Sequence, residues 1–488
     1  MNDIQNIEPA GLWQIFRQMA RIPRPSRHEE KIQDWAENFG KNLGLETIKD
    51  EAGNIIIRKP AVKGMENKKG VILQGHLDMV PQKNSDKLHN FTTDPIELLI
   101  DGEWVTANGT TLGADNGIGA SAALAILASD EIKHGPLEVL LTATEETGMD
   151  GANGLQPGLL KGEILINTDS EDEGELYVGC AGGEDVNITF SYSPEKVPDG
   201  YTGLNLSVTG MKGGHSGIDI IRQRGNAIKL FFRVLNSVYE KTGARLGSLN
   251  CGSLRNAIPR EAFGLLAVDK EKAGEVKKIA GQIENIVKNE LSQTDPDIKI
   301  SVEEAELPGE VTDRLTQENL IKSVLACPNG VIRMSDTMKG LVETSTNLAF
   351  LRSGTDKKSI HIGCMMRSSV DTARNELGTR LRAVFELAGA EVAFSSGYPG
   401  WKPDMNSPIL KTMKRVYAEK FGKVPEVKAI HAGLECGILG GKYPDWDMIS
   451  FGPTIRFPHS PDERVNIASV AKFWDFLLAT LENIPEKS

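Results

Sequence analysis

Residues 137–144 read LEVLLTAT and end in two adjacent glutamates, Glu145 and Glu146. The run is mainly apolar and does not alternate, which is typical of a strand covered on both faces, as in a parallel sheet. Two neighbouring negative charges repel each other, so their position at the end of a buried strand needs a cause. A bound metal is one cause, because one carboxylate can ligate the cation while the other moves protons. A solvated strand end is the simpler alternative for a glutamate pair taken alone.

Several other apolar runs also end in residue types that ligate metals. Asp115, flanked by glycines, opens an apolar helical stretch over residues 118–127. Alternating strand and helix patterns predict an α/β fold with a mostly parallel sheet flanked by helices. Ligands of such sheets bind outside the carboxyl ends of the strands, so we expect these side chains at one edge. The further runs are 70–75, followed by His76 and Asp78; 163–168, followed by Asp169; and 446–452, which leads towards His459.

The chemistry of these side chains predicts a centre with two metal ions. Neutral imidazole and carboxylate oxygen are both good ligands for zinc and similar divalent ions. Two histidines and three carboxylates suit two cations that share one carboxylate. We assign Asp115 as the shared ligand, because it comes from a loop between the other ligand strands. His76 and Asp169 would complete one metal site, and Glu146 and His459 the other.

Two further acidic residues remain for catalysis. Asp78 lies two residues after His76, so both point the same way along an extended strand, and Asp78 can orient the imidazole. Glu145 then remains as the general base, which takes a proton from the attacking water and delivers it to the leaving amine. Three carboxylates against two divalent cations leave about one positive charge, which favours an activated water and a polarised carbonyl.

Taken together and in order, these motifs resemble those of the co-catalytic zinc peptidases related to carnosinase, aminoacylase and glutamate carboxypeptidase. The resemblance runs over nearly the whole chain and agrees with each ligand assignment. It implies a zinc exopeptidase-like catalytic domain and, from the dipeptidase branch, cleavage of Xaa-His and other unblocked dipeptides, carnosine-like substrates included. The motifs are His76-Leu77-Asp78, Gly113-Ala114-Asp115-Asn116-Gly117, Glu145-Glu146 with Gly148, Asn167-Thr168-Asp169 and Pro458-His459-Ser460.

The pattern of apolar and polar residues changes in the middle of the chain, and this change predicts an inserted domain. Residues 187–192 alternate as a half-exposed antiparallel strand would, and residues 226–239 carry apolar side chains at helical spacing. The parallel-sheet pattern returns after residue 401. We therefore expect a catalytic domain made of residues 1–184 and 401–488, with an α+β lid domain, residues 185–400, inserted in it.

The insert and the segment after it supply candidate substrate contacts rather than metal ligands. His215, in the glycine-rich stretch 210–217, would alone be read as a structural loop histidine, but the resemblance implies that it stabilises the oxyanion. Arg367 is a candidate clamp for the substrate carboxylate, with a surface arginine as the alternative. Asn256 is a weaker candidate for an amide contact and is as well explained as a turn residue. The resemblance implies that the turn with Gly433 lies near the substrate's terminus, where Gly433 would donate a backbone hydrogen bond.

Composition limits the partners and the compartment. The formal net charge of −12 argues against nucleic acid and anionic membranes, and leaves a small peptide as the expected partner. The five cysteines show no Cys-x-x-Cys spacing, which fits a reducing cytosol. The amino terminus lacks the features of a secretory signal, so we expect a cytoplasmic protein.

Several alternatives stay open at this level. Zinc is the expected metal, but ligand types alone do not separate it from manganese or cobalt. A tripeptidase, carboxypeptidase or N-acyl-amino-acid deacylase would share the same metal site. A non-catalytic metal-binding scaffold is a rival from another class; it would be favoured by a lost ligand or a replaced Glu145, and neither is seen. A homodimer is also an open alternative, in which His215 would serve its own chain or that of its partner.

Overall fold

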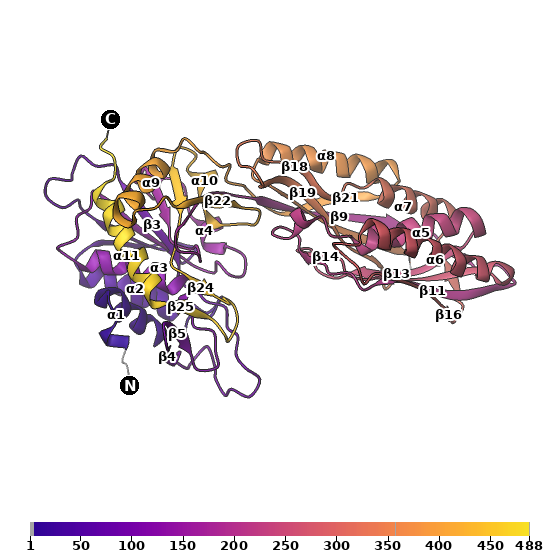
Figure 1. Cartoon of the computed structure of the whole chain (residues 1–488), viewed down its shortest axis with the longest axis horizontal. Coiled ribbons are helices and arrows are strands. Elements are labelled where there is room, and N and C mark those ends of the chain that lie inside the picture. Colours follow the sequence, from indigo (N-terminus) through magenta and orange to yellow (C-terminus); the bar gives the residue numbers. More distant parts are fainter. Residues whose placement is uncertain (1–3, 357, 488) are drawn as a thin grey trace. The chain divides into compact units, whose positions relative to one another are not determined.

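The computed structural model describes residues 4–356 and 358–487 and divides into two units (Figure 1). The first unit comprises Met1–Gly179, Trp401–Ala429 and Leu434–Ser488, and the second comprises Cys180–Gly400 and Ile430–Gly433. The chain therefore leaves the first unit, builds the second, and returns. A short stretch of four residues, 430–433, belongs to the second unit although both its flanks belong to the first.

An eight-stranded sheet forms the centre of the first unit within the described residues. Its central strands β6, β3, β7 and β23 are parallel to one another, whereas β1 pairs with β2, β2 with β6, and β8 with β23 in the antiparallel direction. In order across the sheet the strands are β1 (Glu46–Lys49), β2 (Ile55–Lys59), β6 (Leu137–Thr142), β3 (Val71–His76), β7 (Ile164–Asn167), β23 (Asp447–Ser450), β8 (Glu175–Cys180) and β22 (Glu426–Ile430).

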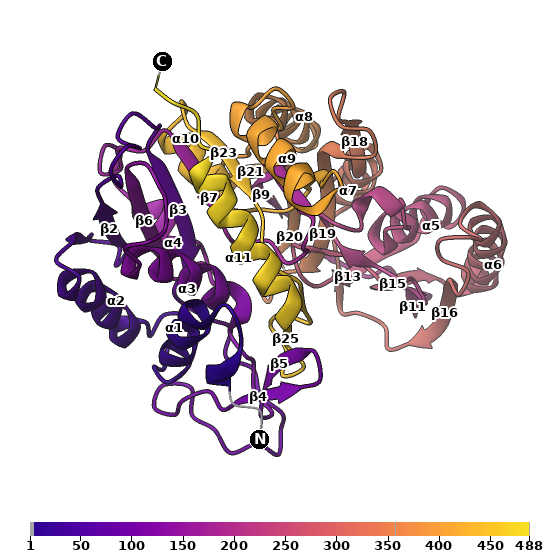
Figure 2. The same ribbon diagram turned by 60° about the vertical axis from the view of Figure 1, so that its left-hand side comes forward.

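Burial explains why the parallel strands read as unbroken apolar runs. Every residue of β3, β6 and β7 is buried, so both faces of the sheet centre are covered. Figure 2 shows α1, α2 and α3 beside the strands β2, β6 and β3, and α9 next to α11. The predicted α/β fold with a mostly parallel sheet is confirmed. The helices are α1 (Ala10–Ala20), α2 (Glu30–Asn42), α3 (Ala114–Ala128), α4 (Asp150–Gly154), α9 (Pro408–Phe421), α10 (Glu435–Lys442) and α11 (Ile467–Glu482).

A smaller sheet in the same unit ties a loop near residue 100 to the C-terminal segment. Its strands, in order, are β24 (Ile455–Arg456), β25 (Arg464–Asn466), β5 (Trp104–Ala107) and β4 (Leu98–Asp101), all antiparallel. The segment between β24 and β25 contains His459. Pairing of β24 with β25, and of β25 with β5, therefore fixes both ends of the loop that carries this histidine.

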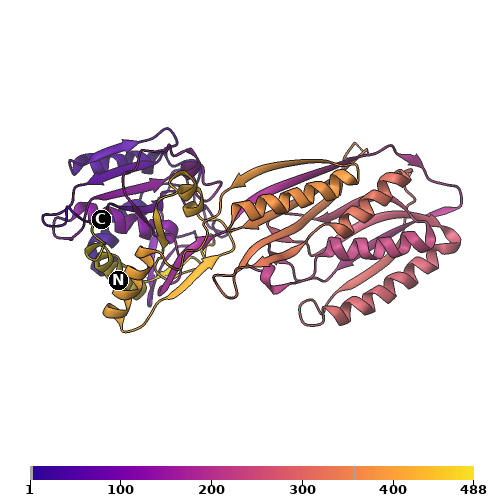
Figure 3. The ribbon, with the colours of Figure 1, turned by 90° about the horizontal axis from the view of Figure 1, so that it is seen from above.

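The second unit is an antiparallel sheet with helices on one of its faces (Figure 3). Alternating burial along β9 and β11 is typical of strands with one face on a core and one in solvent. The strands, in order, are β16 (Lys299–Ala305), β11 (Tyr201–Thr209), β15 (Ala262–Asp269), β13 (Arg245–Gly252), β19 (Val342–Ser353), β20 (Ser359–Ser368), β9 (Gly182–Ser191) and β21 (Glu391–Tyr398), with β18 (Gly330–Met334) beside β19. The helices are α5 (Ala227–Thr242), α6 (Ala273–Glu290), α7 (Arg314–Ala326) and α8 (Asp371–Leu387).

Helix α5 shows how the sequence starts and stops these elements. Asn226 caps its first turn by accepting hydrogen bonds from the backbone N–H groups of Ile228 and Lys229. Gly243 ends it in the left-handed conformation, with φ of 71°. The apolar face of α5 packs into the core of the second unit, which includes the buried Phe231 and Leu235. Among the described residues, none of the helices is both long enough and apolar enough to span a membrane.

Candidate metal centre

The predicted ligands follow neighbouring strands of the parallel sheet. His76 is the last residue of β3, Glu145 and Glu146 come three and four residues after β6, and Asp169 comes two residues after β7. Strands β6, β3 and β7 are adjacent and parallel, so these side chains meet at one edge of the sheet. Asp115 reaches the same edge from the start of α3, where its φ and ψ of −81° and 111° depart from helical values.

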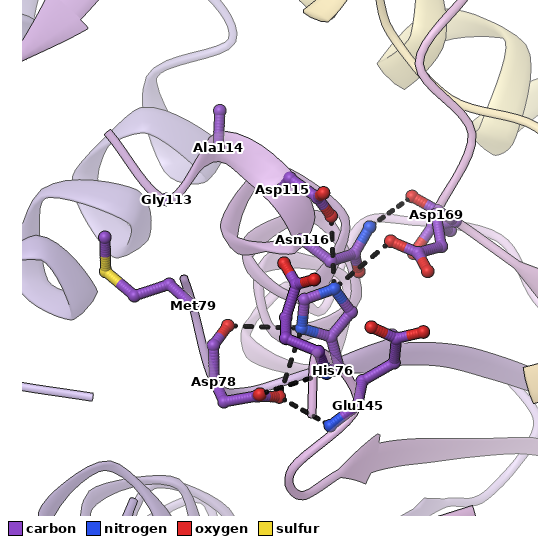
Figure 4. Close-up of polar contacts among 12 residues, drawn as sticks. His76, Asp78, Met79, Gly113, Ala114, Asp115, Asn116, Glu145 and Asp169 are labelled. Carbon is purple, nitrogen blue, oxygen red and sulfur yellow. Dashed lines mark hydrogen bonds and ion pairs between the residues drawn. The ribbon is translucent and has the colours of Figure 1, made fainter. Parts of the chain in front are cut away.

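The Asp115 carboxylate lies between two histidines. Its Oδ1 is 3.1 Å from Nε2 of His76, and its Oδ2 is 3.2 Å from Nε2 of His459. Each histidine also faces a second carboxylate: His76 Nε2 lies 3.3 Å from Asp169 Oδ1, and His459 Nε2 lies 3.0 Å from Glu146 Oε2. Figure 4 shows the first of these two groups, with Asp115 and Asp169 both directed at His76. The five side chains thus form two groups that share Asp115.

The donor set fits a metal ion. One ligand atom from each of His76, Asp115 and Glu146 lies within 4.8 Å of the other two. Within the described residues, Glu146 Oε1 and Asp169 Oδ1 are buried and accept no hydrogen bond. A buried carboxylate oxygen without a donor is costly unless a cation serves it. Imidazole nitrogen and carboxylate oxygen are both ligands that zinc and related divalent ions accept.

The electrostatics of the centre are those of carboxylates crowded around two imidazoles. Burial raises the pKa of Asp169 and of Glu145 well above the usual range, and neighbouring carboxylates add to the rise. The carboxylates of Asp115 and Glu146, which accept hydrogen bonds from the protonated imidazole, raise the pKa of His459 to about 11. Binding of a divalent cation requires neutral imidazoles and ionised carboxylates, so metal and protons compete for these side chains.

Asp78 connects the histidine strand to both glutamates. Its carboxylate lies 3.3 Å from Nδ1 of His76, and Nδ1 also lies 3.1 Å from the Asp78 carbonyl oxygen. A proton on Nδ1 shared with these oxygens leaves Nε2 directed at Asp115. Asp78 also accepts hydrogen bonds from the backbone N–H groups of Glu145, at 2.9 Å, and Glu146, at 3.2 Å. Sequence reasoning expected the contact to His76 and missed the two backbone contacts.

Two fully buried charges near the centre were also missed. Arg24 donates from Nη2 to the carbonyl oxygen of Gly113 at 2.6 Å, and from Nη1 to those of Leu77 at 2.9 Å and Asp78 at 3.1 Å. Glu463 accepts hydrogen bonds from the backbone N–H groups of residues 112–115. Burial raises the pKa of Glu463 to about 7, and its N–H donors oppose that rise. Its position four residues after His459 was the one available signal in the sequence.

The candidate substrate contacts all lie in the second unit. His215 Nδ1 accepts hydrogen bonds from the backbone N–H groups of Gly217 at 3.2 Å and Ile218 at 3.1 Å. With Nδ1 acting as acceptor, the ring proton of the neutral imidazole is on Nε2. Burial and the nearby Arg367 lower the pKa of His215, so this neutral tautomer is favoured. The imidazole is therefore prepared to donate one hydrogen bond from Nε2.

Arg367 is a buried cation with spare donors. It lies on β20, is 5% exposed, and donates from Nη1 to the hydroxyl of Tyr398 at 3.1 Å. Its Nε is buried and has no hydrogen-bond partner among the described residues. His431 is close in the same unit, where Nε2 lies 2.7 Å from the hydroxyl of Ser345. Burial, with the charge of Arg367, lowers the pKa of His431 to about 3.

The two weaker candidates differ in their surroundings. Asn256 is exposed, and its carbonyl oxygen accepts a hydrogen bond from the N–H of Ser216 at 2.7 Å, so its backbone supports the turn after His215. Gly433 lies against the ring of Tyr398, and a Cβ there would be 3.0 Å from that ring. Lack of a side chain at Gly433 thus permits close packing.

A sheet edge with histidines and carboxylates in this arrangement defines a class of protein, the metal-dependent hydrolases. The chain matches the model of peptidase family M20/M25/M40 over residues 72–483. It belongs to this family of metallopeptidases.

Full-length relatives agree with this assignment. The chain is 47% identical over 487 residues to the cytosol non-specific dipeptidase of Escherichia coli K12, covering all of both chains. It is 49% identical to the crystal structure of aminoacylhistidine dipeptidase from Vibrio alginolyticus, with a TM-score of 0.95 and coverage of 100% of this chain and 99% of that one. The aminopeptidase PepT structure from Bacillus cereus shares the fold alone, at 16% identity and a TM-score of 0.57, over 98% of this chain and 99% of that one.

Proposed function

We propose that this protein is a metal-dependent dipeptidase of the cytoplasm that hydrolyses Xaa-His and other unblocked dipeptides. The observation that carries the proposal is the position of Asp115, with one oxygen on His76 and the other on His459. This arrangement supports a pair of metal ions at a sheet edge. The names of the Escherichia coli and Vibrio relatives, each about half identical over the full length, support dipeptides as the substrate class.

Two divalent ions are the proposed cofactors, with zinc first and manganese or cobalt as alternatives. His76 and Asp169 would hold one ion, His459 and Glu146 the other, and Asp115 both. Bound ions of this kind supply a water of lowered pKa and polarise a substrate carbonyl. Asp78 would keep His76 in the tautomer that presents Nε2 to the metal, through its contacts to Nδ1.

Glu145 is the proposed proton carrier. It is adjacent to the ligand Glu146, and its backbone is fixed by Asp78 rather than by a metal. Burial, Asp169, Glu435 and Glu146 all raise its pKa, which favours a carboxylate that can hold a proton during turnover. Glu145 would take a proton from the attacking water and give it to the departing amine nitrogen.

The second unit would supply the contacts to the substrate. The proton on His215 Nε2 is suited to stabilise the negative charge that develops on the carbonyl oxygen. Arg367, with an unpaired buried Nε, is suited to bind the terminal carboxylate of a free dipeptide. Asn256 and Gly433 remain proposed minor contacts, to a substrate amide and through a backbone N–H respectively.

A substrate panel tests this proposal. The purified protein is stripped with a chelator, and zinc, manganese or cobalt is returned separately. Hydrolysis is then measured on Xaa-His dipeptides, tripeptides and N-acetyl amino acids. We expect activity that depends on added metal and is highest on unblocked dipeptides. Higher activity on tripeptides or N-acetyl amino acids would replace the dipeptidase proposal with a sibling hydrolase, and no hydrolysis in any mixture would favour a metal-binding scaffold.

A further inference from the structure

A single buried carboxylate accepts four consecutive backbone N–H groups next to the metal centre. Glu463 Oε2 accepts from Leu112 at 2.8 Å and Gly113 at 2.9 Å, and Oε1 accepts from Ala114 at 2.8 Å and Asp115 at 3.2 Å. Glu463 is 2% exposed. Residues 112–115, named the Asp115 loop below, therefore have all their N–H groups bound to one side chain.

The Asp115 loop has a backbone that needs outside support. Gly113 has φ of 70°, in the left-handed region, and a Cβ there would be 2.5 Å from Nη2 of Arg24. Asp115 is not helical although α3 begins one residue earlier. Arg24 binds the Gly113 carbonyl oxygen at 2.6 Å, so the loop is held by a buried cation as well as by Glu463. Buried charges of opposite sign thus bind its carbonyl and its N–H groups.

Glu463 is itself held by the chain that supplies the second histidine. Its backbone N–H donates to the carbonyl oxygen of Ser460 at 3.0 Å, and its carbonyl oxygen accepts from the hydroxyl of Thr106 at 3.0 Å. Strand β25 begins at the next residue, where Arg464 pairs with Thr106 of β5. His459 lies four residues before Glu463 in this tightly bound turn. The segment that contains His459 therefore also binds the Asp115 loop, through the Glu463 side chain.

We infer that Glu463 is a positioning residue of the metal centre, which holds the Asp115 loop so that the Asp115 carboxylate faces His76 and His459 before any metal binds. This inference rests on the proposed two-metal site. The physical reason is that a carboxylate can accept four N–H groups, whereas a carboxamide replaces one acceptor with a donor. Two N–H groups would then lose their acceptor inside the protein, and the loop would move or become mobile.

The test compares the same substitution at two buried glutamates that both accept backbone N–H groups. Glu138, on β6, is 6% exposed; it accepts hydrogen bonds from the backbone N–H groups of Lys161 and Gly162, both at 2.7 Å, and from Nε of Arg58 at 2.8 Å. It lies near the start of β6, whereas the ligands follow the end of that strand. Glu138→Gln therefore removes a buried carboxylate with backbone donors, far along the strand from the metal ligands, and serves as the matched control for Glu463→Gln.

Zinc affinity of the metal-free proteins is measured by competition with a chromogenic chelator, together with thermal stability. We expect Glu463→Gln to raise the zinc dissociation constant about 10–100-fold, and Glu138→Gln to change it less than about twofold, at a similar loss of stability. Equal zinc affinity of the Glu463→Gln and unmodified proteins would overturn the inference, as would an equal loss of affinity in Glu138→Gln. Failure of the unmodified protein to bind zinc would instead refute the proposed metal site.

A second measurement does not depend on folding of the variants. Hydrogen exchange of the amides of residues 112–115 is followed in the unmodified protein with and without zinc. We expect slow exchange in both states, because Glu463 rather than the metal holds these N–H groups. Fast exchange that becomes slow only after zinc is added would overturn the inference.

If Glu463→Gln does not fold, Glu463→Asp replaces it in the zinc competition. We expect weakened zinc binding, because the shorter side chain reaches fewer of the four N–H donors.

Discussion

Glu145→Gln separates proton transfer from metal binding more cleanly than any other change at this centre. Glutamine has nearly the same shape as glutamate. The contacts to Asp78 use the backbone N–H groups of residues 145 and 146, so the substitution removes no hydrogen bond between the Glu145 side chain and the described residues. The contact to Asp78 is made by the Glu145 backbone, so the neighbouring Glu146, a proposed ligand, should keep its place. Loss of a general base costs about 10²–10⁴ in turnover, or about 3–5 kcal/mol of transition-state stabilisation.

Stability should not fall, because like charges surround this side chain. Burial and the charges of Asp169, Glu435 and Glu146 disfavour a negative charge at Glu145 more than His76 favours it, and a neutral glutamine removes that cost. The assay combines kcat on an Xaa-His dipeptide with metal content by elemental analysis and with thermal melting. Glu146→Gln is the matched control, and we expect it to lose metal. Retention of more than about a tenth of the turnover by Glu145→Gln, or loss of its metal, would refute the assignment of Glu145 as base.

Three further predictions concern the bridge, the substrate clamp and a buried histidine. Asp115→Ala should lose metal and activity together, because both proposed metals would share that carboxylate; a variant with unchanged metal content would contradict this. Arg367→Ala should raise KM for free dipeptides at least about tenfold more than for their carboxamides, since guanidinium binds a carboxylate in a charge-assisted pair; equal effects would remove Arg367 as the clamp. His431 has a pKa of about 3 in the folded protein and about 6.5 in the unfolded chain, so the unfolded chain binds more protons between these values. The free energy of unfolding should therefore fall as the pH drops below about 6.5. In urea titrations between about pH 6.5 and pH 4.5, His431→Gln should lessen this fall by up to about 1.4 kcal/mol per pH unit, and an identical slope in both proteins would contradict it.

Helices and strands are predicted best from the sequence where the periodicity of apolar side chains determines the structure. Helix α5 spans Ala227–Thr242 where apolar side chains at helical spacing cover residues 226–239, and it begins directly after the capping Asn226. Strand β23 is shorter than its apolar run, with Asp447–Ser450 against residues 446–452. Helix α8 begins at Asp371 without a hydrogen bond from a capping side chain, and a start of this kind is harder to locate from the sequence.

Contacts between side chains and distant backbone were beyond the reach of sequence patterns. Glu463 binds N–H groups about 350 residues earlier, and Arg24 binds carbonyl oxygens on two different loops. Residues of any type can provide these backbone atoms. The sequence of the contacted loop therefore gives no sign that the contacts form. The four residues 430–433 that join the second unit were likewise unpredicted, because so short an excursion has no periodicity. Metal ligands were easier to propose, since their residue types are restricted.

Anomalous X-ray scattering from crystals grown with zinc tests the central proposal most directly. The account predicts two zinc peaks on either side of the Asp115 carboxylate, one beside His76 and Asp169 and the other beside His459 and Glu146. A single peak bound by only one of the histidines, or zinc bound away from Asp115, would contradict it.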